Sequence, residues 1–203
     1  MKIRTVEYAG TLAAPDGPIP GDLPQVAFSG RSNVGKSSLI NLLLRRTRHR
    51  IAHVSGQPGK TRAVNFYRVN DAFFLADLPG FGYARVPRPL RQGWKALVEG
   101  YLSREDGPRG VVHLVDSRHD PTTLDLEMLD YLATSGLPAL VVLTKVDKLK
   151  SSRRERILLA AVEKLGLDPE QVLPVSAHTG EGREALLDAV AALLGLEAGE
   201  EEA

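Results

Sequence analysis

Short apolar runs alternate with amphipathic segments along most of this chain. The runs at 24–29, 111–115 and 140–143 are nearly continuous, which is typical of parallel strands that are covered on both faces. A short strand or helix is predicted near Ile3–Tyr8, and a last strand over Val172–Val175.

Apolar residues at helical spacing predict helices between these strands. The helices are expected at 36–46, 90–103, 122–134, 153–165 and 183–194. In the fourth helix, Ser152 and Glu155 have the spacing of a capping box, and Gly166 is a stop signal. In the last helix, the residues expected to face inward are Ala185, Leu186, Val190, Leu193 and Leu194.

One pair of strands is expected to run antiparallel. Ala63–Val69 and Ala72–Ala76 have the pattern of strands, and Asn70-Asp71 between them is typical of a tight hairpin turn. Elsewhere strands and helices alternate. The sequence therefore predicts an α/β fold of three layers, with a mostly parallel, doubly wound sheet that contains one antiparallel hairpin strand.

The chain of 203 residues is expected to form one domain at 23–195, preceded by a lead-in at 1–22 and followed by an acidic, disordered tail at 196–203. It contains no cysteine, which excludes disulfides, thiol catalysis and Cys-ligated zinc. Neither a signal-peptide pattern nor a membrane-spanning apolar run is visible, so we expect a cytoplasmic protein.

The net charge of +1 conceals three basic segments. These segments contain Arg45, Arg46, Arg48 and Arg50; Arg85, Arg88, Arg91 and Lys95; and Lys148, Lys150, Arg153, Arg154 and Arg156. Each segment could simply be a solvated face. The alternative is contact with the phosphate backbone of RNA, because two of the three adjoin loops that are candidates for sensing a phosphate.

The strongest chemical signal is the stretch from Gly30 to Ser37, which fits the phosphate-loop pattern G-x-x-x-x-G-K-[ST]. It lies between a predicted strand and a predicted helix, so backbone N–H groups and the helix dipole would favour an anion there. Lys36 would bind the outer phosphates and Ser37 would offer a hydroxyl to Mg²⁺. The residues expected to bind the nucleotide here are Gly30, Arg31, Ser32, Asn33, Val34, Gly35, Lys36, Ser37 and Ser38.

A second motif, Thr144-Lys145-Val146-Asp147, selects the base. Asp147 can accept hydrogen bonds from the N1–H and the exocyclic amine of guanine, whereas adenine would leave the carboxylate unpaired. Lys145 can lie along the base. Ser176-Ala177, after the next strand, would bring a backbone N–H to the guanine O6.

Three further residues are candidates for sensing the γ-phosphate and holding Mg²⁺. Asp77 can hold a water on the metal, and the amide of Gly80 can touch the γ-phosphate. Thr61, just before a predicted strand, is the best second hydroxyl for Mg²⁺. The expected metal ligands are thus Ser37, Thr61 and Asp77, and the candidate catalytic residues are Asn33, Lys36, Thr61 and Gly80.

Over residues 24–194 the chain resembles the EngB family (also called YihA or YsxC) of TRAFAC-class GTPases. Beside the motifs above, the resemblance is carried by Pro58-Gly59-Lys60-Thr61, by the run from Asp77 to Ala84, and by Asp116-Ser117-Arg118-His119. It implies nucleotide contact by Gly59, a GTP/GDP and Mg²⁺ site, and a monomeric cytoplasmic GTPase that binds the maturing 50S subunit and its rRNA, with no DNA or membrane partner. Thr144 stands where many GTPases carry asparagine, and the loss of that amide is expected to loosen nucleotide binding.

The catalytic group for hydrolysis is open. Ras-like enzymes place a glutamine directly after the glycine of Asp-x-x-Gly, but this chain has Phe81, so we expect slow intrinsic hydrolysis. In potassium-activated relatives, an asparagine at the position of Asn33 ligates K⁺, and the match implies a K⁺ site here. A loop-shaping hydrogen bond is the alternative role for Asn33.

Other functions remain to be weighed against a GTPase switch. A P-loop phosphotransferase would share the phosphate loop but has no reason for Thr-Lys-Val-Asp. A nucleotide-gated rRNA-binding module with negligible hydrolysis is compatible with Phe81. A membrane-trafficking switch is disfavoured, because the chain has no cysteine to lipidate and Lys2 stands where myristoylation needs glycine.

Overall fold

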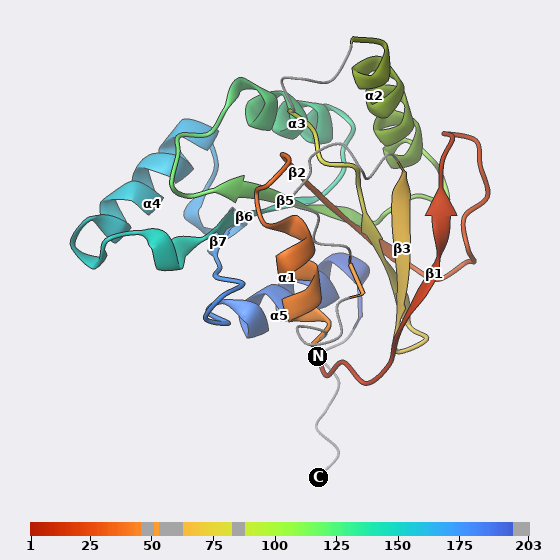
Figure 1. Ribbon diagram of the computed structural model, residues 1–203, viewed down its shortest axis with the longest axis horizontal. Helices are drawn as coiled ribbons and strands as arrows, with labels where there is room; N and C mark the ends of the chain where they lie inside the picture. Colours follow the sequence, from red (N-terminus) through yellow and green to blue (C-terminus); the bar gives the residue numbers. More distant parts are fainter. Residues whose placement is uncertain (46–50, 53–62, 83–87, 197–203) are drawn as a thin grey trace.

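The computed structural model describes residues 1–45, 51–52, 63–82 and 88–196 (Figure 1). The strands are β1 (Val6–Leu12), β2 (Gln25–Gly30), β3 (Val64–Val69), β4 (Phe73–Asp77), β5 (Gly110–Asp116), β6 (Ala139–Thr144) and β7 (Val172–Pro174). The α-helices are α1 (Lys36–Leu43), α2 (Arg88–Leu102), α3 (Thr123–Thr134), α4 (Ser151–Leu165) and α5 (Arg183–Leu194). Two short 3-10 helices, η1 (Val146–Lys148) and η2 (Pro169–Gln171), lie on either side of α4 in sequence.

The seven strands form one sheet in the order β1-β3-β4-β2-β5-β6-β7. β3 pairs antiparallel with both β1 and β4, and every other neighbouring pair is parallel. The predicted sheet with a single antiparallel hairpin strand is therefore confirmed. β2 lies between β4 and β5, so the carboxyl ends of these three strands meet at one edge, where open α/β sheets bind ligands.

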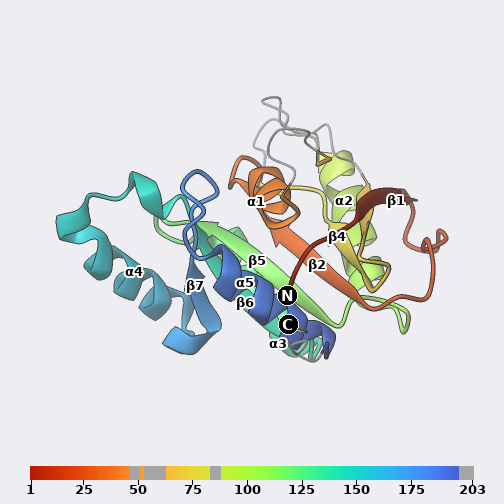
Figure 2. The same ribbon diagram turned by 90° about the horizontal axis from the view of Figure 1, so that it is seen from below.

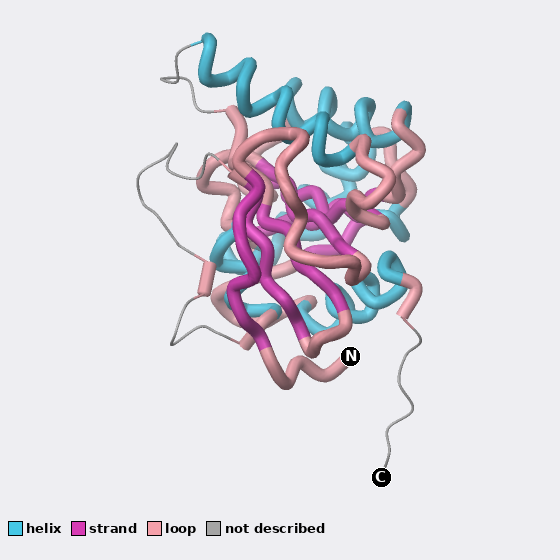
Figure 3. The backbone as a smooth tube through the Cα atoms, turned by 90° about the vertical axis from the view of Figure 1, so that its right-hand side faces the viewer, coloured by secondary structure: helices cyan, strands magenta, loops and turns pink. Residues whose placement is uncertain are grey.

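Helices cover both faces of the sheet, as the strands in Figure 3 lie between helical layers. α1 and α5 pack on one face, around a core that includes Phe28, Leu39 and Leu186. α2, α3 and α4 cover the other face, where Phe66 and Tyr101 meet edge to face. Figure 2 shows α4 at one end of the sheet and β1 at the other. Among the described residues, no helix is long and apolar enough to cross a lipid bilayer.

The hairpin turn forms where the sequence predicts it. Asn70 and Asp71 both have positive φ, 53° and 52°, which is the backbone of the tight turns that suit antiparallel strands. The side chain of Asn70 also accepts hydrogen bonds from the amides of Arg4 and Thr5 at 2.7 and 3.1 Å. Of the strand or helix expected near Ile3–Tyr8, the structure has the strand, which starts at Val6, ends at Leu12 and extends the sheet beyond the hairpin.

The predicted capping of α4 is wrong at its start. The helix begins at Ser151, so its N-cap is Lys150; Ser152 already lies inside the helix and cannot cap it. Gly166 ends the helix with φ 65°, as expected.

The predicted inward face of α5 is only partly right. Ala185 is exposed and Leu193 is half-buried, whereas Leu186, Val190 and Leu194 are buried as expected. The buried stripe is completed by Leu187 and Ala191, which follow Leu186 and Val190 directly. Buried residues therefore recur at i, i+1, i+4 and i+5 along the face of α5 that packs against the sheet.

Some predictions concern residues that lie outside the described part of the chain. These are most of the acidic tail, from residue 197 onward, and the basic residues Arg46, Arg48, Arg50 and Arg85.

The turn between β7 and α5 gives a testable prediction about stability. Gly182 has φ 75°, and a Cβ there would collide with the carbonyl oxygen of Pro174. Gly180 has a similar φ of 85° but open space around it. We expect Gly180→Ala to lower the free energy of unfolding by about 1–2 kcal/mol, and Gly182→Ala by roughly 3–4 kcal/mol, since the backbone must also shift.

Urea denaturation of the two variants and the parent chain measures this difference. The matched pair shares the left-handed backbone, so equal losses would contradict the assigned clash at Gly182.

Candidate functional site

The predicted phosphate loop connects β2 to α1 at the carboxyl edge of the sheet. Gly35 is the N-cap of α1, and no described side chain caps the helix, so its first-turn amides stay available to an anion. Ser37 and Ser38 follow in the first turn. The loop therefore combines available backbone donors with the positive end of a helix dipole, which together make an anion site.

Lys36 is buried (8% exposed) and its ammonium forms an ion pair with the carboxylate of Asp77, which is 3% exposed. Asp77 is the last residue of β4, the parallel neighbour of β2. This contact brings two sequence-predicted residues together although they lie 41 positions apart. A buried ammonium needs such a partner, because removing it from water without compensation is costly.

The donors at this edge suit Mg²⁺. Ser37 would supply a hydroxyl and Asp77 a carboxylate, and oxygen ligands of this kind are the ones that Mg²⁺ prefers. Among the described residues there is no cluster of three or more His, Cys, Asp or Glu. Gly59 and Thr61, the other predicted contacts, lie outside the described residues.

The Asp-x-x-Gly loop is fastened to the phosphate loop. The amide of Leu78 donates to the carbonyl of Phe28 at 3.0 Å, and the amide of Ser32 donates to the carbonyl of Phe81 at 2.8 Å. The hydroxyl of Ser32 also approaches the carbonyl oxygen of Gly80, at 3.4 Å. Gly80 is thus held beside the loop that would carry the phosphates, as its predicted role requires.

A cavity of about 660 Å³ opens beside this loop and is the candidate site for the base and sugar. Its walls come from α1 and from the loops after β6 and β7. The predicted residues that line it are Gly35, Ser38, Thr144, Lys145, Asp147 and Ala177. Lys148 of the third basic segment also lines the cavity, and so do Leu39, Asn41, His178, Thr179 and Gly180, which the sequence pattern does not single out.

Asp147 is held as a carboxylate at the cavity wall. The hydroxyl of Ser176 donates to its Oδ1 at 2.7 Å, and the ammonium of Lys148 lies 3.2 Å from its Oδ2. Burial alone would raise the pKa of Asp147, but these two contacts outweigh it and the pKa is lowered. An ionised, oriented carboxylate accepts hydrogen bonds and donates none, which matches the two adjacent N–H donors of guanine.

Thr144 links the base loop to the phosphate loop. The absence of an asparagine side-chain amide at this position predicts looser nucleotide binding, but the threonine hydroxyl makes a contact of its own. Its hydroxyl donates to the carbonyl oxygen of Val34 in the phosphate loop at 2.7 Å, and both residues are buried. The expected loss applied to an amide, but the hydroxyl of threonine reaches a backbone acceptor instead. The two loops are therefore connected directly.

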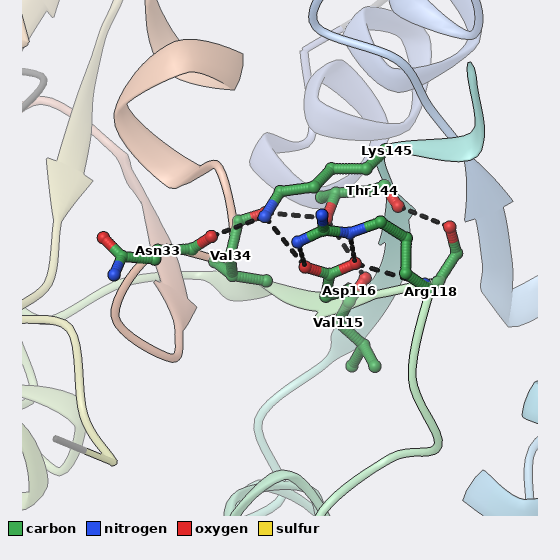
Figure 4. Close-up of polar contacts among 8 residues, drawn as sticks. Asn33, Val34, Val115, Asp116, Arg118, Thr144 and Lys145 are labelled. Carbon is green, nitrogen blue, oxygen red and sulfur yellow. Dashed lines mark hydrogen bonds and ion pairs between the residues drawn. The ribbon is translucent and has the colours of Figure 1, made fainter. Parts of the chain in front are cut away.

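Lys145 makes a second link, which Figure 4 shows together with Asp116 and Arg118. Its ammonium donates to the carbonyl oxygen of Asn33 at 2.6 Å and to Oδ2 of Asp116 at 2.8 Å. Arg118 also forms two side-chain hydrogen bonds to the Asp116 carboxylate. Burial opposes ionisation of Asp116, but these donors lower its pKa to about 2. Lys145 is therefore braced by a carboxylate that stays charged at neutral pH.

Asn33 is exposed and has φ 65°. In Figure 4 its carbonyl oxygen meets Lys145, while its side-chain amide points away from the Asp116 cluster. The backbone of Asn33 thus has a role in the link between the loops. Its side chain faces away from that link and is open to solvent.

A buried polar cluster next to this site is not predicted by the sequence pattern. His113, in the middle of an otherwise apolar strand, is fully buried and contacts Ser29 of β2 and Asp125 of α3. Its ring is stacked on Phe81. The signal in the sequence is a single polar residue within Val111–Val115, but only the register of β2 against β5 reveals its partners.

Comparison with known families gives two matches. The family model described as "50S ribosome-binding GTPase" matches residues 25–145, and the model of the "Elongation factor Tu GTP binding domain" matches residues 105–195. The first match covers more than half of the chain. Together they span the phosphate loop, the base loop and the last strand and helix.

Curated relatives match along almost the whole chain. A "probable GTP-binding protein EngB" of Gemmatimonas aurantiaca is 49% identical over 197 residues, which cover 97% of this chain and 96% of that protein. A protein of the same description from Pelotomaculum thermopropionicum is 47% identical over 198 residues, with 97% and 98% covered.

Solved structures share the fold. The crystal structure of a probable GTP-binding protein engB has a TM-score of 0.68 at 23% identity and covers 84% of this chain and 98% of that chain. A variant of Aquifex aeolicus Era, bound to GDP and aluminium fluoride, has a TM-score of 0.66 at 23% identity, with 89% and 59% covered. At these identities the likeness concerns the fold alone.

The Thr144–Val34 contact gives a second testable prediction. Thr144→Val keeps the shape of the side chain but leaves the buried carbonyl of Val34 without this donor, which costs about 1–3 kcal/mol. We expect weaker binding of GDP, by roughly tenfold, because the base loop and the phosphate loop lose one of the two contacts that connect them.

Titration of fluorescent GDP measures this loss, and Thr144→Ser is the matched control, since it keeps the hydroxyl and removes only a methyl group. If the valine and serine variants bind GDP equally well, the hydroxyl is not the tie.

Proposed function

Because the chain belongs to the EngB family of GTP-binding proteins, we propose that it hydrolyses GTP to GDP and phosphate and uses this reaction to control its binding to the maturing 50S ribosomal subunit. The observation that supports this best is that the phosphate loop is linked both to the Asp-x-x-Gly loop and to the base loop. Lys36, Asp77 and Gly80 stand at the phosphate end of the site, and Asp147 with Ser176 stands at its base end.

Guanine specificity in this proposal rests on Asp147. Its lowered pKa keeps it an acceptor, and Ser176 orients it toward the cavity that it lines. Lys145, fixed by Asp116, would lie along one face of the base. Adenine would present an acceptor where guanine presents two N–H donors and would be rejected, since a carboxylate that is only 10% exposed would then face a lone pair.

Phosphate binding requires Lys36 to exchange partners. In the structure its ammonium is paired with Asp77; with GTP present it would turn to the β- and γ-phosphates. Ser37, Asp77 and Thr61 are the residues that would then hold Mg²⁺. The metal neutralises charge on the phosphates when it is bound. The amide of Gly80 would meet the γ-phosphate, which makes the Asp-x-x-Gly loop sensitive to hydrolysis.

Hydrolysis itself is expected to be slow, because Phe81 cannot orient a water molecule. We infer that K⁺ held by Asn33 supplies part of the missing charge stabilisation. The exposed side-chain amide of Asn33, next to a backbone that is fixed by Lys145, supports this role.

The prediction is that single-turnover hydrolysis of GTP runs at least about tenfold faster in KCl than in NaCl at equal ionic strength, which corresponds to roughly 1.4 kcal/mol of barrier. Asn33→Ala should remove the difference, whereas Asn33→Asp should retain it, because a carboxylate also ligates K⁺.

Equal rates in the two salts would refute the K⁺ site. If no phosphate is released in either salt or with 50S particles present, the chain acts instead as a nucleotide-gated binding module.

The proposed partner is rRNA in the precursor of the 50S subunit, which the chain would bind as a monomer in the cytoplasm. The matching family description and the exposed basic residues Lys150, Arg153 and Arg156 of the α4 region support this. Two other residues of the same basic segment already have acidic partners. Lys148 contacts Asp147 in the candidate nucleotide site, and Arg154 is paired with Glu181 in the loop after β7.

Co-sedimentation with 50S subunits tests the switch. We expect more chain in the 50S fraction with a non-hydrolysable GTP analogue than with GDP, and a loss of binding as salt rises, because phosphate contacts release counterions. Arg153→Glu with Arg156→Glu should weaken binding, and Glu155→Gln serves as a neighbouring control. Binding that ignores the nucleotide would contradict the switch.

A further inference from the structure

Phe81 follows Gly80 directly, and its side chain is turned inward. The ring stacks on the imidazole of His113, with centroids 5.9 Å apart and planes 8° apart. Its backbone carbonyl accepts from Ser32 at 2.8 Å, but its amide reaches the carbonyl of Gly30 only at 3.4 Å. One short backbone bond and one aromatic contact therefore hold the residue next to the γ-phosphate sensor.

His113 lies in the middle of β5, and its ring is the one on which Phe81 stacks. It is fully buried in β5, and Ser29 is its register partner on β2. The hydroxyl of Ser29 lies 2.8 Å from Nδ1. On the other side of the ring, Nε2 lies 3.7 Å from Oδ1 of Asp125, which is also buried. Among the described residues, neither Nε2 nor this Oδ1 has a hydrogen-bond partner.

These neighbours define how the ring is held. A carboxylate only accepts, so the arrangement favours a proton on Nε2 facing Asp125 and a lone pair on Nδ1 that accepts from Ser29. Asp125 is itself fixed, because its Oδ2 accepts from the amide and the hydroxyl of Thr122 at 2.8 and 2.7 Å. The imidazole is thus hydrogen-bonded to Ser29 of β2, and its other nitrogen faces the carboxylate of Asp125 at 3.7 Å.

We propose that His113 is a positioning residue for the γ-phosphate-sensing loop. Its ring face contacts Phe81 and so places the amide of Gly80. The role is to favour GTP over GDP at the sensor, because only GTP has the phosphate that Gly80 would meet. This inference rests on the proposed contact between Gly80 and the γ-phosphate.

Two variants of His113 separate the contribution of its ring from that of its polar contacts. His113→Asn keeps a polar atom near the position of Nδ1 but has no ring, whereas His113→Phe keeps the ring and loses both polar contacts. Phe81→Leu removes the other half of the stack from the loop side. Dissociation constants for fluorescent GDP and for a fluorescent, slowly hydrolysed GTP analogue are measured for the full chain and each variant.

We expect Phe81→Leu and His113→Asn each to weaken binding of the GTP analogue about fivefold relative to binding of GDP. A loss of this size is what the removal of an aromatic pair would cause. His113→Phe should change this ratio by less than about twofold. The double variant Phe81→Leu with His113→Asn should be no worse than either single variant, since both remove the same contact.

A merely structural histidine gives a different pattern. His113→Asn would then lower the melting temperature and weaken both nucleotides equally, and this result would overturn the proposal. If His113→Asn does not fold, Phe81→Leu decides alone, because Phe81 is only half-buried; an unchanged ratio in that variant also overturns the proposal.

Gly80→Ala distinguishes this inference from the function on which it rests. A Cβ there would lie 3.2 Å from the Ser32 hydroxyl and would crowd the sensor. If this variant loses no affinity for the GTP analogue relative to GDP, the role of Gly80 fails. If it does, but Phe81→Leu leaves the ratio unchanged, only the seat on His113 fails.

Discussion

A buried lysine must have its charge compensated, and the site is arranged around that requirement. Lys36 is the first residue of α1 and is buried. The carboxylate of Asp77, at the end of the neighbouring strand, forms an ion pair with its ammonium. The partner can come from β4 because β2 and β4 are adjacent and parallel, so their carboxyl ends coincide. The same geometry places the carboxylate where a metal beside the phosphates would need it. Under the proposed function, phosphates would replace the carboxylate as the partner of the lysine and the carboxylate would serve the metal, so that neither buried charge would be left without a partner.

The second lysine of the site is held in the opposite way. Lys145 is bound by the carbonyl of Asn33 and by Asp116, whose pKa of about 2 keeps it charged throughout the neutral range. Thr144 adds a neutral tie to Val34. The base end of the site is thus held by contacts within the protein itself, whereas the phosphate end contains an ion pair that, under the proposed function, phosphates would replace. A pocket that is held in this way would lower the cost of ordering on binding, and the exchangeable pair would make the site sensitive to the phosphates.

Much of this could be predicted from the sequence, and the limits have physical causes. The phosphate loop, Asp77 and Asp147 were predictable because each follows or ends a strand, and parallel strand ends meet. The linking role of Thr144 was judged by the amide it lacks, although a hydroxyl at the same place reaches a backbone carbonyl. The contact between Ser29 and His113 depends on the register of two strands far apart in sequence, which periodicity does not encode. The prediction of a capping box in α4 was wrong because a shift of one or two residues in the start of a helix decides which side chain can reach the first-turn amides.

Phe81 connects the two properties of the γ-phosphate loop. A glutamine at this position would have to extend toward the nucleotide to orient water, whereas the phenyl ring is stacked inward on His113. The side chain that packs the loop against His113 is therefore turned away from the place where a glutamine would act. Under the proposed function, this one residue would both position Gly80 and slow intrinsic hydrolysis, and faster turnover would require a group that reaches the phosphates from another direction. A cation held by the exposed side chain of Asn33, which points away from the Asp116 cluster, would be such a group.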